Sequence, residues 1–177
     1  MGCGLVANIP LDCRNAMGGL REMKIKVLPS PTVLTNDYTL TSGVIAIGNG
    51  SSSQLGWYTY GLEKEVSDFT EVVTVNHANG TVFSKQDIDL IINQLTATKR
   101  NEIDNLKQNR LQVAVWTKDN SYWLFGYENG LDLVTSTATS GKGSGDRNGY
   151  NLKFSGQEYY QMPNMSQATY LTLHASN

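Results

Sequence analysis

The two histidines, His77 and His174, are the side chains of this sequence best suited to act as a general base. A nucleophilic triad needs that base to be held in place by packing and by a hydrogen-bonded partner. His77 falls in the turn of a predicted hairpin, and His174 lies three residues from the last residue of the sequence. We therefore expect neither histidine to be catalytic.

Cys3 and Cys13 are the candidates for metal binding or for a disulfide bond. They fit no C-x-x-C spacing and have no nearby histidine, so they do not predict a zinc site. A bridge between them is geometrically allowed. We favour two reduced thiols, because the protein is expected to be made in the cytoplasm, where thiols stay reduced.

The glycine-rich run 141–145, Gly-Lys-Gly-Ser-Gly, suggests a phosphate-binding loop, because such turns aim several N–H groups at an anion. A Walker loop requires glycine five positions before its Gly-Lys pair and Ser or Thr directly after the lysine. The sequence has Ser136 and Gly143 at these positions. We interpret the run as a mobile loop between two strands.

Asp87 and Asp89 could act as paired carboxylates, but they share the solvated face of a predicted strand, where acidic residues are ordinary. The sequence thus indicates no catalytic residue, no metal site and no cofactor. We expect a protein that is not an enzyme and whose role is assembly.

The amino-acid composition also favours a role in assembly. Charged residues make up 17% of the 177 residues, against roughly 25% in an average soluble domain. A surface with few charges favours contact with other proteins, and a net charge of -2 offers no basic footprint for tight binding of nucleic acid. No apolar run reaches the about 18 residues of a membrane span, so no membrane partner is expected. The length suits one domain, spanning 1–177.

The first third of the chain has weak patterns. Residues 1–21 show no sustained period and predict an irregular N-terminal arm. Residues 22–28 alternate apolar and charged side chains, as a strand does. The stretch 29–56 contains a brief β-like run at 44–47 between Pro-, Gly- and Ser-rich segments, and we expect it to be a long loop that projects toward a partner.

A long hairpin is the clearest signal. Residues 68–75 and 81–92 flank His77-Ala78-Asn79-Gly80, whose Asn-Gly pair tolerates positive φ. The second arm alternates, with Ile88, Leu90 and Ile92 predicted inward and Asp87 and Asp89 outward. The first arm is apolar on both faces around Val73 and Val75, so both of its faces should be covered.

The remainder predicts one amphipathic helix at 96–109, followed by strands. The expected strands are 111–116, 122–127, 131–139 and 150–154, with a loop at 140–149 and a C-terminal extension, 163–177, that adds a strand at 170–173. The fold class is therefore mainly β (α+β): an antiparallel β-sandwich or barrel with a long hairpin and one flanking α-helix.

Four segments resemble a family of virion structural proteins from tailed phages of Bacteroidetes-type hosts. They are 68–83 (DFTEVVTVNHANGTVF), 99–111 (KRNEIDNLKQNRL), 122–131 (YWLFGYENGL) and 145–158 (GDRNGYNLKFSGQE). The resemblance covers roughly residues 66 to 158, and the early Asp12-Cys13 with Gly18-Gly19 is similar to that family's start. The order of hairpin, helix and returning strands resembles the tail-tube fold; 29–56 and the tail after Pro163 have no place in that pattern.

This resemblance implies a subunit that closes into rings, usually of six copies, whose hairpins build an inner barrel around a channel for DNA. The implied partners are further copies of the chain and other tail or neck proteins, with DNA as transient cargo. The implied location is the virion, assembled in the cytoplasm of the host bacterium. Val73, Val75, Asp87 and Asp89 are the expected interface and channel residues, and outward aspartates would suit an acidic channel.

Two other classes stay open at this point. One is another virion component of similar architecture, such as a neck, terminator or capsid-associated protein. The other is a sandwich that binds a small ligand or carbohydrate, for which exposed Trp57, Tyr58 and Tyr60 would form the platform.

Overall fold

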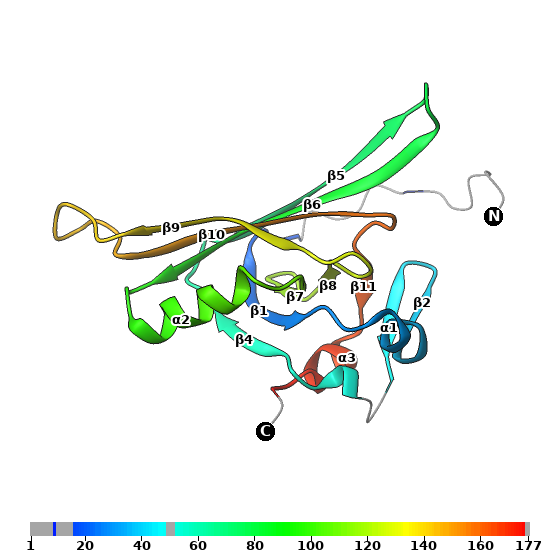
Figure 1. The fold of residues 1–177 in the computed structure, drawn as a ribbon, viewed down its shortest axis with the longest axis horizontal. Coiled ribbons are helices and arrows are strands. Elements are labelled where there is room, and N and C mark those ends of the chain that lie inside the picture. Colours follow the sequence, from blue (N-terminus) through cyan, green and yellow to red (C-terminus); the bar gives the residue numbers. More distant parts are fainter. Residues whose placement is uncertain (1–8, 10–15, 49–51, 176–177) are drawn as a thin grey trace.

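The computed structural model describes residues 9, 16–48 and 52–175 and contains two open β-sheets with three α-helices around them (Figure 1). The predicted β-sandwich with a flanking helix is confirmed. Neither sheet closes on itself within the described residues, so the sandwich alternative holds and the barrel alternative is wrong for one chain.

The larger sheet has seven strands in the order β2-β3-β11-β8-β7-β1-β4. Its strands are β1 (Leu20–Val27), β2 (Tyr38–Thr41), β3 (Val44–Ile47), β4 (Tyr58–Gly61), β7 (Leu111–Thr117), β8 (Tyr122–Phe125) and β11 (Asn164–Met165). All neighbours are antiparallel except β3 and β11, which run parallel. Strand β7, which lies between β8 and β1, is buried on both faces, so this sheet has core on either side.

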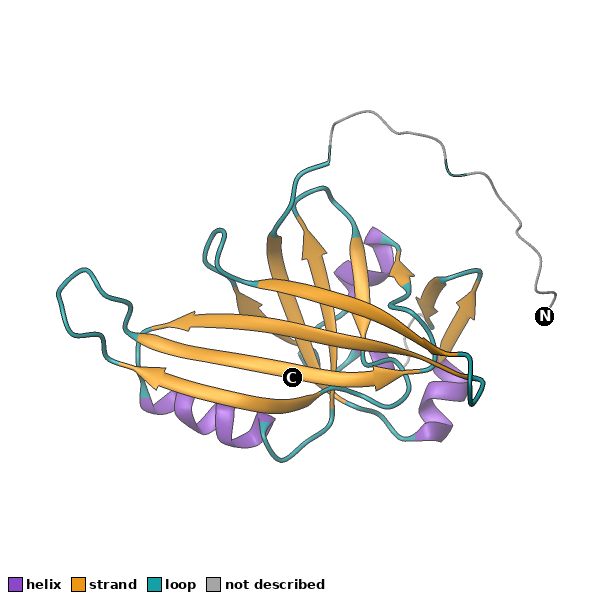
Figure 2. Cartoon of the chain, turned by 90° about the horizontal axis from the view of Figure 1, so that it is seen from above, coloured by secondary structure: helices purple, strands orange, loops and turns teal. Residues whose placement is uncertain are grey.

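The smaller sheet has four strands in the order β5-β6-β10-β9, all antiparallel. They are β5 (Asp68–Asn76), β6 (Thr81–Asn93), β9 (Asp132–Thr139) and β10 (Gly149–Glu158). These long strands run across the strands of the larger sheet, and one whole face of the small sheet points away from it (Figure 2). The β5–β6 hairpin projects beyond the rest of the sheet (Figure 1).

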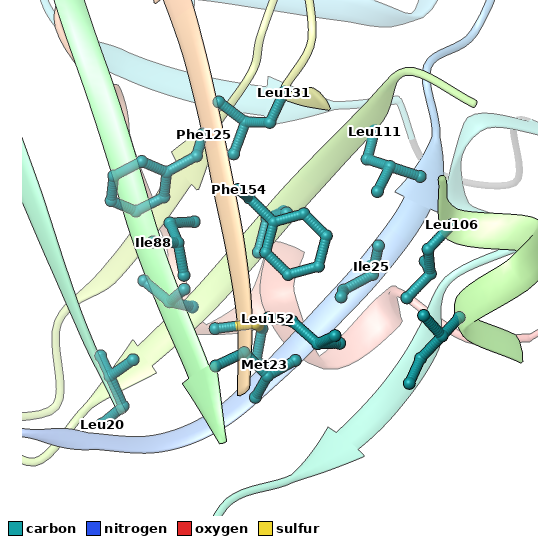
Figure 3. Close-up of a cluster of buried hydrophobic side chains, with 14 of the residues drawn as sticks. Leu20, Met23, Ile25, Ile88, Leu106, Leu111, Phe125, Leu131, Leu152 and Phe154 are labelled. Carbon is teal, nitrogen blue, oxygen red and sulfur yellow. The ribbon is translucent and has the colours of Figure 1, made fainter. Parts of the chain in front are cut away.

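The main core fills the space between the sheets. Met23 and Ile25 of β1 meet Ile88 of β6 and Leu152 and Phe154 of β10 there (Figure 3), and each is at most 2% exposed. This confirms the alternation predicted for the second hairpin arm and for residues 150–154. A second core lies on the other face of the seven-stranded sheet and includes Ala114, Leu124, Trp57 and Tyr170 among its buried residues.

Helix α2 (Ala97–Leu106) closes one end of the main core with Ile103 and Leu106. The side chain of Thr96 caps it by accepting a hydrogen bond from the N–H of Lys99 at 3.3 Å. The helix ends before the predicted Asn109, because the N–H groups of Gln108 and Asn109 bond three residues back and tighten the last turn.

The prediction of a long loop at 29–56 is wrong. The segment contains α1 (Pro31–Asp37), the β2–β3 hairpin and a short 3₁₀ helix, Ser52–Gln54. Pro31 occupies the first turn of α1, where the missing N–H costs nothing. The β2–β3 turn places Ser42 and Gly43 at φ of 50° and 78°, and Ile45 and Ile47 enter the second core.

The C-terminal segment is also misassigned by the sequence pattern. Residues 163–175 are part of the fold rather than an extension, because β11 pairs inside the larger sheet and α3 (Gln167–Thr172) replaces the strand predicted at 170–173. Ser166 caps α3 by accepting from the N–H of Thr169 at 3.1 Å. Helical spacing then buries both Tyr170 and Leu173.

Lys24 ties this C-terminal helix to β1. Its ammonium group is buried, donates to the carbonyl oxygens of Tyr170 and Leu173 at 3.1 and 2.9 Å, and lies 4.4 Å from the centre of the Tyr170 ring. Burial lowers the pKa of Lys24, and the nearby Glu22 carboxylate opposes this shift. Lys24 thus supplies the donors that the C-terminal carbonyls of α3 need.

We expect Lys24→Met to destabilise the protein by about 1–3 kcal/mol, because the two carbonyl acceptors lose their charged donor while the side-chain stem is retained. Denaturant unfolding followed by circular dichroism measures this loss. Lys153→Met is the matched control, since Lys153 is half-exposed and makes one ion pair of 3.9 Å. Equal stability of the two variants would show that Lys24 contributes nothing.

The N-terminal arm predicted at 1–21 lies largely outside the described residues, including Cys3 and Cys13. Residues 16–18 are irregular, as predicted, and β1 begins at Leu20, two residues earlier than expected.

Candidate assembly surface

The four-stranded sheet has a face directed away from the main core, here called the open face. Strand register places alternate residues of each strand on it: 68, 70, 72 and 74 of β5; 83, 85, 87, 89 and 91 of β6; 151, 153, 155 and 157 of β10; 132, 135, 137 and 139 of β9. A bulge in β9 opposite Lys153 and Phe154 shifts the alternation of that strand.

Asp87 and Asp89 both lie on the open face, as the alternation predicts, because Ile88 and Leu90 beside them are fully buried. Asp87 forms an ion pair of 3.0 Å with Lys85. Burial alone would raise the pKa of Asp87, but hydrogen bonds from Ser155 and Lys85 and the charge of Lys85 outweigh it and lower that pKa.

Acidic residues outnumber basic ones on the open face. Asp68 stands directly opposite Asp89 across β5 and β6, and Asp132 stands opposite Ser155 across β9 and β10. With Asp87, these make four aspartates against the two lysines Lys85 and Lys153. Threonines fill most of the remaining positions on β5 and β9. The face is therefore polar and acidic, with its lysines already paired to aspartates.

Asp68 and Asp132 were not among the predicted channel residues. Asp68 has the same alternation signal as Asp87, one strand away. Asp132 falls out of step with the open-face positions of β9 because the bulge adds one residue between it and Thr135. Its position is not predictable from a strict period of two.

The tip of the hairpin is apolar on both faces and uncovered. Val73, Val75 and Val82 are 43%, 49% and 51% exposed on the side of the sheet that faces the core further down, and Val72 is 51% exposed on the open face. Strand β10 stops at Glu158, opposite Ser84, so it does not reach the tip. Single exposed valines are normal, but Val73, Val75 and Val82 lie on the same side of one projecting hairpin and form an apolar patch.

Both edges of the four-stranded sheet are unpaired. The described residues offer no strand beyond β5 on one side or beyond β9 on the other. Residues 72–76 of β5 and 134–139 of β9 are exposed on both faces. Long edges of this kind present free N–H and C=O groups to another chain.

Glu158, the last residue of β10, is 2% exposed and anchors residues 128–130 of the segment between β8 and β9. Its Oε1 accepts from the N–H groups of Asn129 and Gly130 at 3.0 and 3.1 Å, and its Oε2 accepts from the N–H of Glu128 at 3.2 Å. Burial raises the pKa of Glu158, against the opposing effect of the three N–H donors.

A raised pKa in the folded state means that folding binds a proton between the ordinary carboxyl pKa and the folded value. The free energy of unfolding therefore falls as pH rises through that window, and we expect Glu158→Gln to remove this dependence. Denaturant unfolding at a series of pH values from the ordinary carboxyl range to neutrality measures the slope. Glu63→Gln, at an exposed site, should keep it; an unchanged slope in Glu158→Gln would contradict the assignment.

The residues of the predicted carbohydrate platform do not form a shared exposed surface. Trp57 is 1% exposed and its indole N–H donates to the Ser53 carbonyl, and the Tyr60 hydroxyl donates to Glu102. Tyr58 alone of the three predicted platform residues is exposed, so the predicted carbohydrate platform is wrong.

The glycine-rich loop, predicted at 140–149 and observed at 140–148, is organised around the carboxylate of its own Asp146. Asp146 Oδ2 accepts from the N–H groups of Lys142 and Gly143 at 2.8 and 2.7 Å, and these bonds lower the pKa of Asp146. The N–H groups that a phosphate would need are thus occupied. His77 and His174 are both exposed and belong to separate elements.

Among the described residues, no group of three or more His, Cys, Asp or Glu side chains is arranged to hold a metal ion. Within the same residues, no helix has the length and apolarity to cross a membrane. Comparison of the chain with models of protein families, with curated proteins and with solved structures returned no match.

Proposed function

We propose that this chain is a phage virion structural protein, a tail tube subunit that assembles into stacked rings around a channel for DNA. The observation that carries the proposal is the four-stranded sheet: among the residues that the structure describes, neither of its edges is paired, and its hairpin tip exposes valines on both faces. Such a surface is a liability in a protein that works alone. In a ring, each edge is covered by a neighbouring copy.

Strand directions suit such a ring. The directions alternate across β5, β6, β10 and β9, so a β9 placed beside the β5 of a rotated neighbour runs antiparallel to it. The two edge strands have similar lengths, nine and eight residues. Four strands per copy give an even number in any ring, and closure needs no parallel pair. Six copies, as the resemblance implies, would make one continuous barrel.

The open face then lines the channel. Its four aspartates repel the phosphates of DNA, and its two lysines are paired to aspartates rather than free to grip the passing polymer. Threonine hydroxyls along β5 and β9 keep the wall wet without adding charge. DNA is cargo in this proposal, and other tail or neck proteins are partners at the ends of the tube.

Light scattering across a concentration series tests this function. A tube subunit adds ring upon ring, so we expect the mass to keep growing with concentration. A mass that stops at one ring would favour a neck or terminator protein. A chain that stays monomeric at every concentration would contradict self-assembly.

A further inference from the structure

Asn-Gly pairs are chemically labile, because the backbone nitrogen of glycine can attack the side-chain carbonyl carbon of the preceding asparagine without hindrance from a side chain. The sequence has four such pairs, and Asn49-Gly50 lies outside the described residues. The other three, beginning at Asn79, Asn129 and Asn148, lie in turns or strand ends with very different surroundings. The same reaction of an Asn-Gly pair can therefore be compared at three sites with different surroundings.

Asn79 sits in the turn at the tip of the β5–β6 hairpin, and all four turn residues, 77–80, are exposed. Its side-chain Oδ1 accepts from the hydroxyl of Thr81 at 2.8 Å and from the N–H of Thr81 at 3.4 Å. These contacts direct the Asn79 side chain along the turn toward Thr81, past the Gly80 nitrogen. They also polarise the side-chain carbonyl of Asn79, which is the group that the nitrogen attacks. Gly80 has φ of 69° and an open space where a Cβ would be.

The contacts of Asn129 and Gly130 disfavour deamidation at this pair. Its side-chain amide donates to the carbonyl of Gln157 at 3.1 Å, and the N–H of Gly130 is bonded to the buried carboxylate of Glu158 at 3.1 Å. The attacking nitrogen must lose its proton, and a carboxylate acceptor stabilises the protonated form. Gly130 is also buried.

Asn148 is the last residue of the loop that joins β9 to β10, and its contacts hold it in place. Its Oδ1 accepts from the N–H of Leu95 at 3.3 Å, and its backbone carbonyl accepts from the N–H of Gln94 at 2.7 Å. Gly149 is buried as the first residue of β10 and pairs with strands on both sides. The backbone here cannot move into the geometry of a five-membered ring.

We propose that Asn79 is a site of spontaneous deamidation in the folded chain, and that assembly protects it. The Gly80 nitrogen bonds to Asn79 Cγ while the Cγ–Nδ2 bond breaks, and ammonia leaves with the proton from Gly80. Water then opens the succinimide to aspartate or isoaspartate. The net reaction consumes one water and releases one ammonia, with no oxidation or reduction.

Deamidation of Asn79 changes the charge and the backbone of the hairpin tip. A new carboxylate appears in the turn, one residue pair beyond the exposed pair of Val75 and Val82, and isoaspartate adds a methylene group to the backbone of the turn. If the valines are buried between copies, which rests on the proposed function, the modified tip carries a charge into an apolar contact. A free subunit therefore loses assembly competence with time, whereas a subunit in a tube keeps it.

Peptide mapping by mass spectrometry tests the chemistry on the full-length chain incubated at low concentration and mildly alkaline pH. We expect the mass shift of deamidation to accumulate in the Asn79 peptide, with the Asn129 and Asn148 peptides staying at background. In denaturant the three peptides should react alike, and Gly80→Ala should slow the reaction at Asn79. Equal rates at the three sites in the folded chain would overturn the proposal.

The assembly part is tested with the same chain above and below its assembly concentration, and with Asn79→Asp. We expect slower modification in the assembled fraction and a higher assembly threshold for Asn79→Asp. Equal rates in assembled and free protein would overturn protection by assembly. A chain that never assembles would overturn protection together with the proposed function, while selective reaction at Asn79 would still establish the modification site.

Discussion

Replacing Val73 and Val75 together by glutamate is expected to abolish self-assembly while leaving the chain folded. Both valines are close to half-exposed in the single chain, so the substitution removes little packing from the core. Burying the exposed half of a valine contributes roughly 1 kcal/mol, and a glutamate in its place must also lose its hydration, which costs about 2 kcal/mol or more. Two such losses weaken each contact between copies by about a hundredfold or more.

Light scattering of the double variant at concentrations where the unmodified chain assembles measures the effect, and circular dichroism checks the fold. Leu171→Glu is the matched control, because Leu171 is 61% exposed on α3, outside the four-stranded sheet. It receives the same charge and should assemble normally. Assembly of the double variant, or failure of the control alone, would remove the hairpin tip from the interface.

Among Gly→Ala substitutions in the described residues, Gly149→Ala is expected to disrupt folding most, by about 3 kcal/mol or more. A Cβ built at Gly149 lies 2.1 Å from the carbonyl oxygen of Ile92 and 3.0 Å from the Cα of Asn93. Both atoms belong to the backbone of β6, so a side-chain rotation cannot relieve the clash. The strands β6 and β10 must separate at this end of the sheet.

Denaturant unfolding measures this loss, with Gly145→Ala as the control. A Cβ at Gly145 meets nothing within 4 Å, in the same loop between β9 and β10. Gly145→Ala should therefore unfold at nearly the same denaturant concentration as the unmodified chain. Similar stability of the two variants would show that β6 and β10 do not approach as closely at Gly149 as described.

Long strands with one buried face could be predicted from the sequence. The alternation of Tyr150, Leu152 and Phe154 and of Ile88 and Leu90 places each side chain correctly, because one face meets the core and the other meets water. Helix α2 was also predictable, since its apolar spacing and the Thr96 cap are local signals.

Short elements held by distant contacts could not be predicted. The β-like run at 44–47 was visible and forms β3, but the two-residue strand β11 is in place only because it pairs with β3, more than a hundred residues earlier in the chain, and with β8. The run Tyr170-Leu171-Thr172-Leu173 alternates like a strand, yet the Ser166 cap and Lys24 from β1 stabilise it as a helix. Trp57 has the residue type of a binding platform, but the second core buries it.

Only part of the candidate assembly surface could be predicted from the sequence. Val73, Val75, Asp87 and Asp89 follow from the pattern of one hairpin. The unpaired edges of β5 and β9 follow from strand order, which the sequence pattern does not give. Asp132 joins the open face through a bulge that shifts its strand by one residue.

Negative-stain electron microscopy of the purified chain across a concentration series tests the central claim most directly, namely that the edges of the four-stranded sheet join copies into stacked rings. We expect hollow tubes whose length increases with concentration and whose formation is lost in the Val73→Glu, Val75→Glu variant. Particles of single-chain size at every concentration would contradict the claim, as would tubes that form equally well from the double variant.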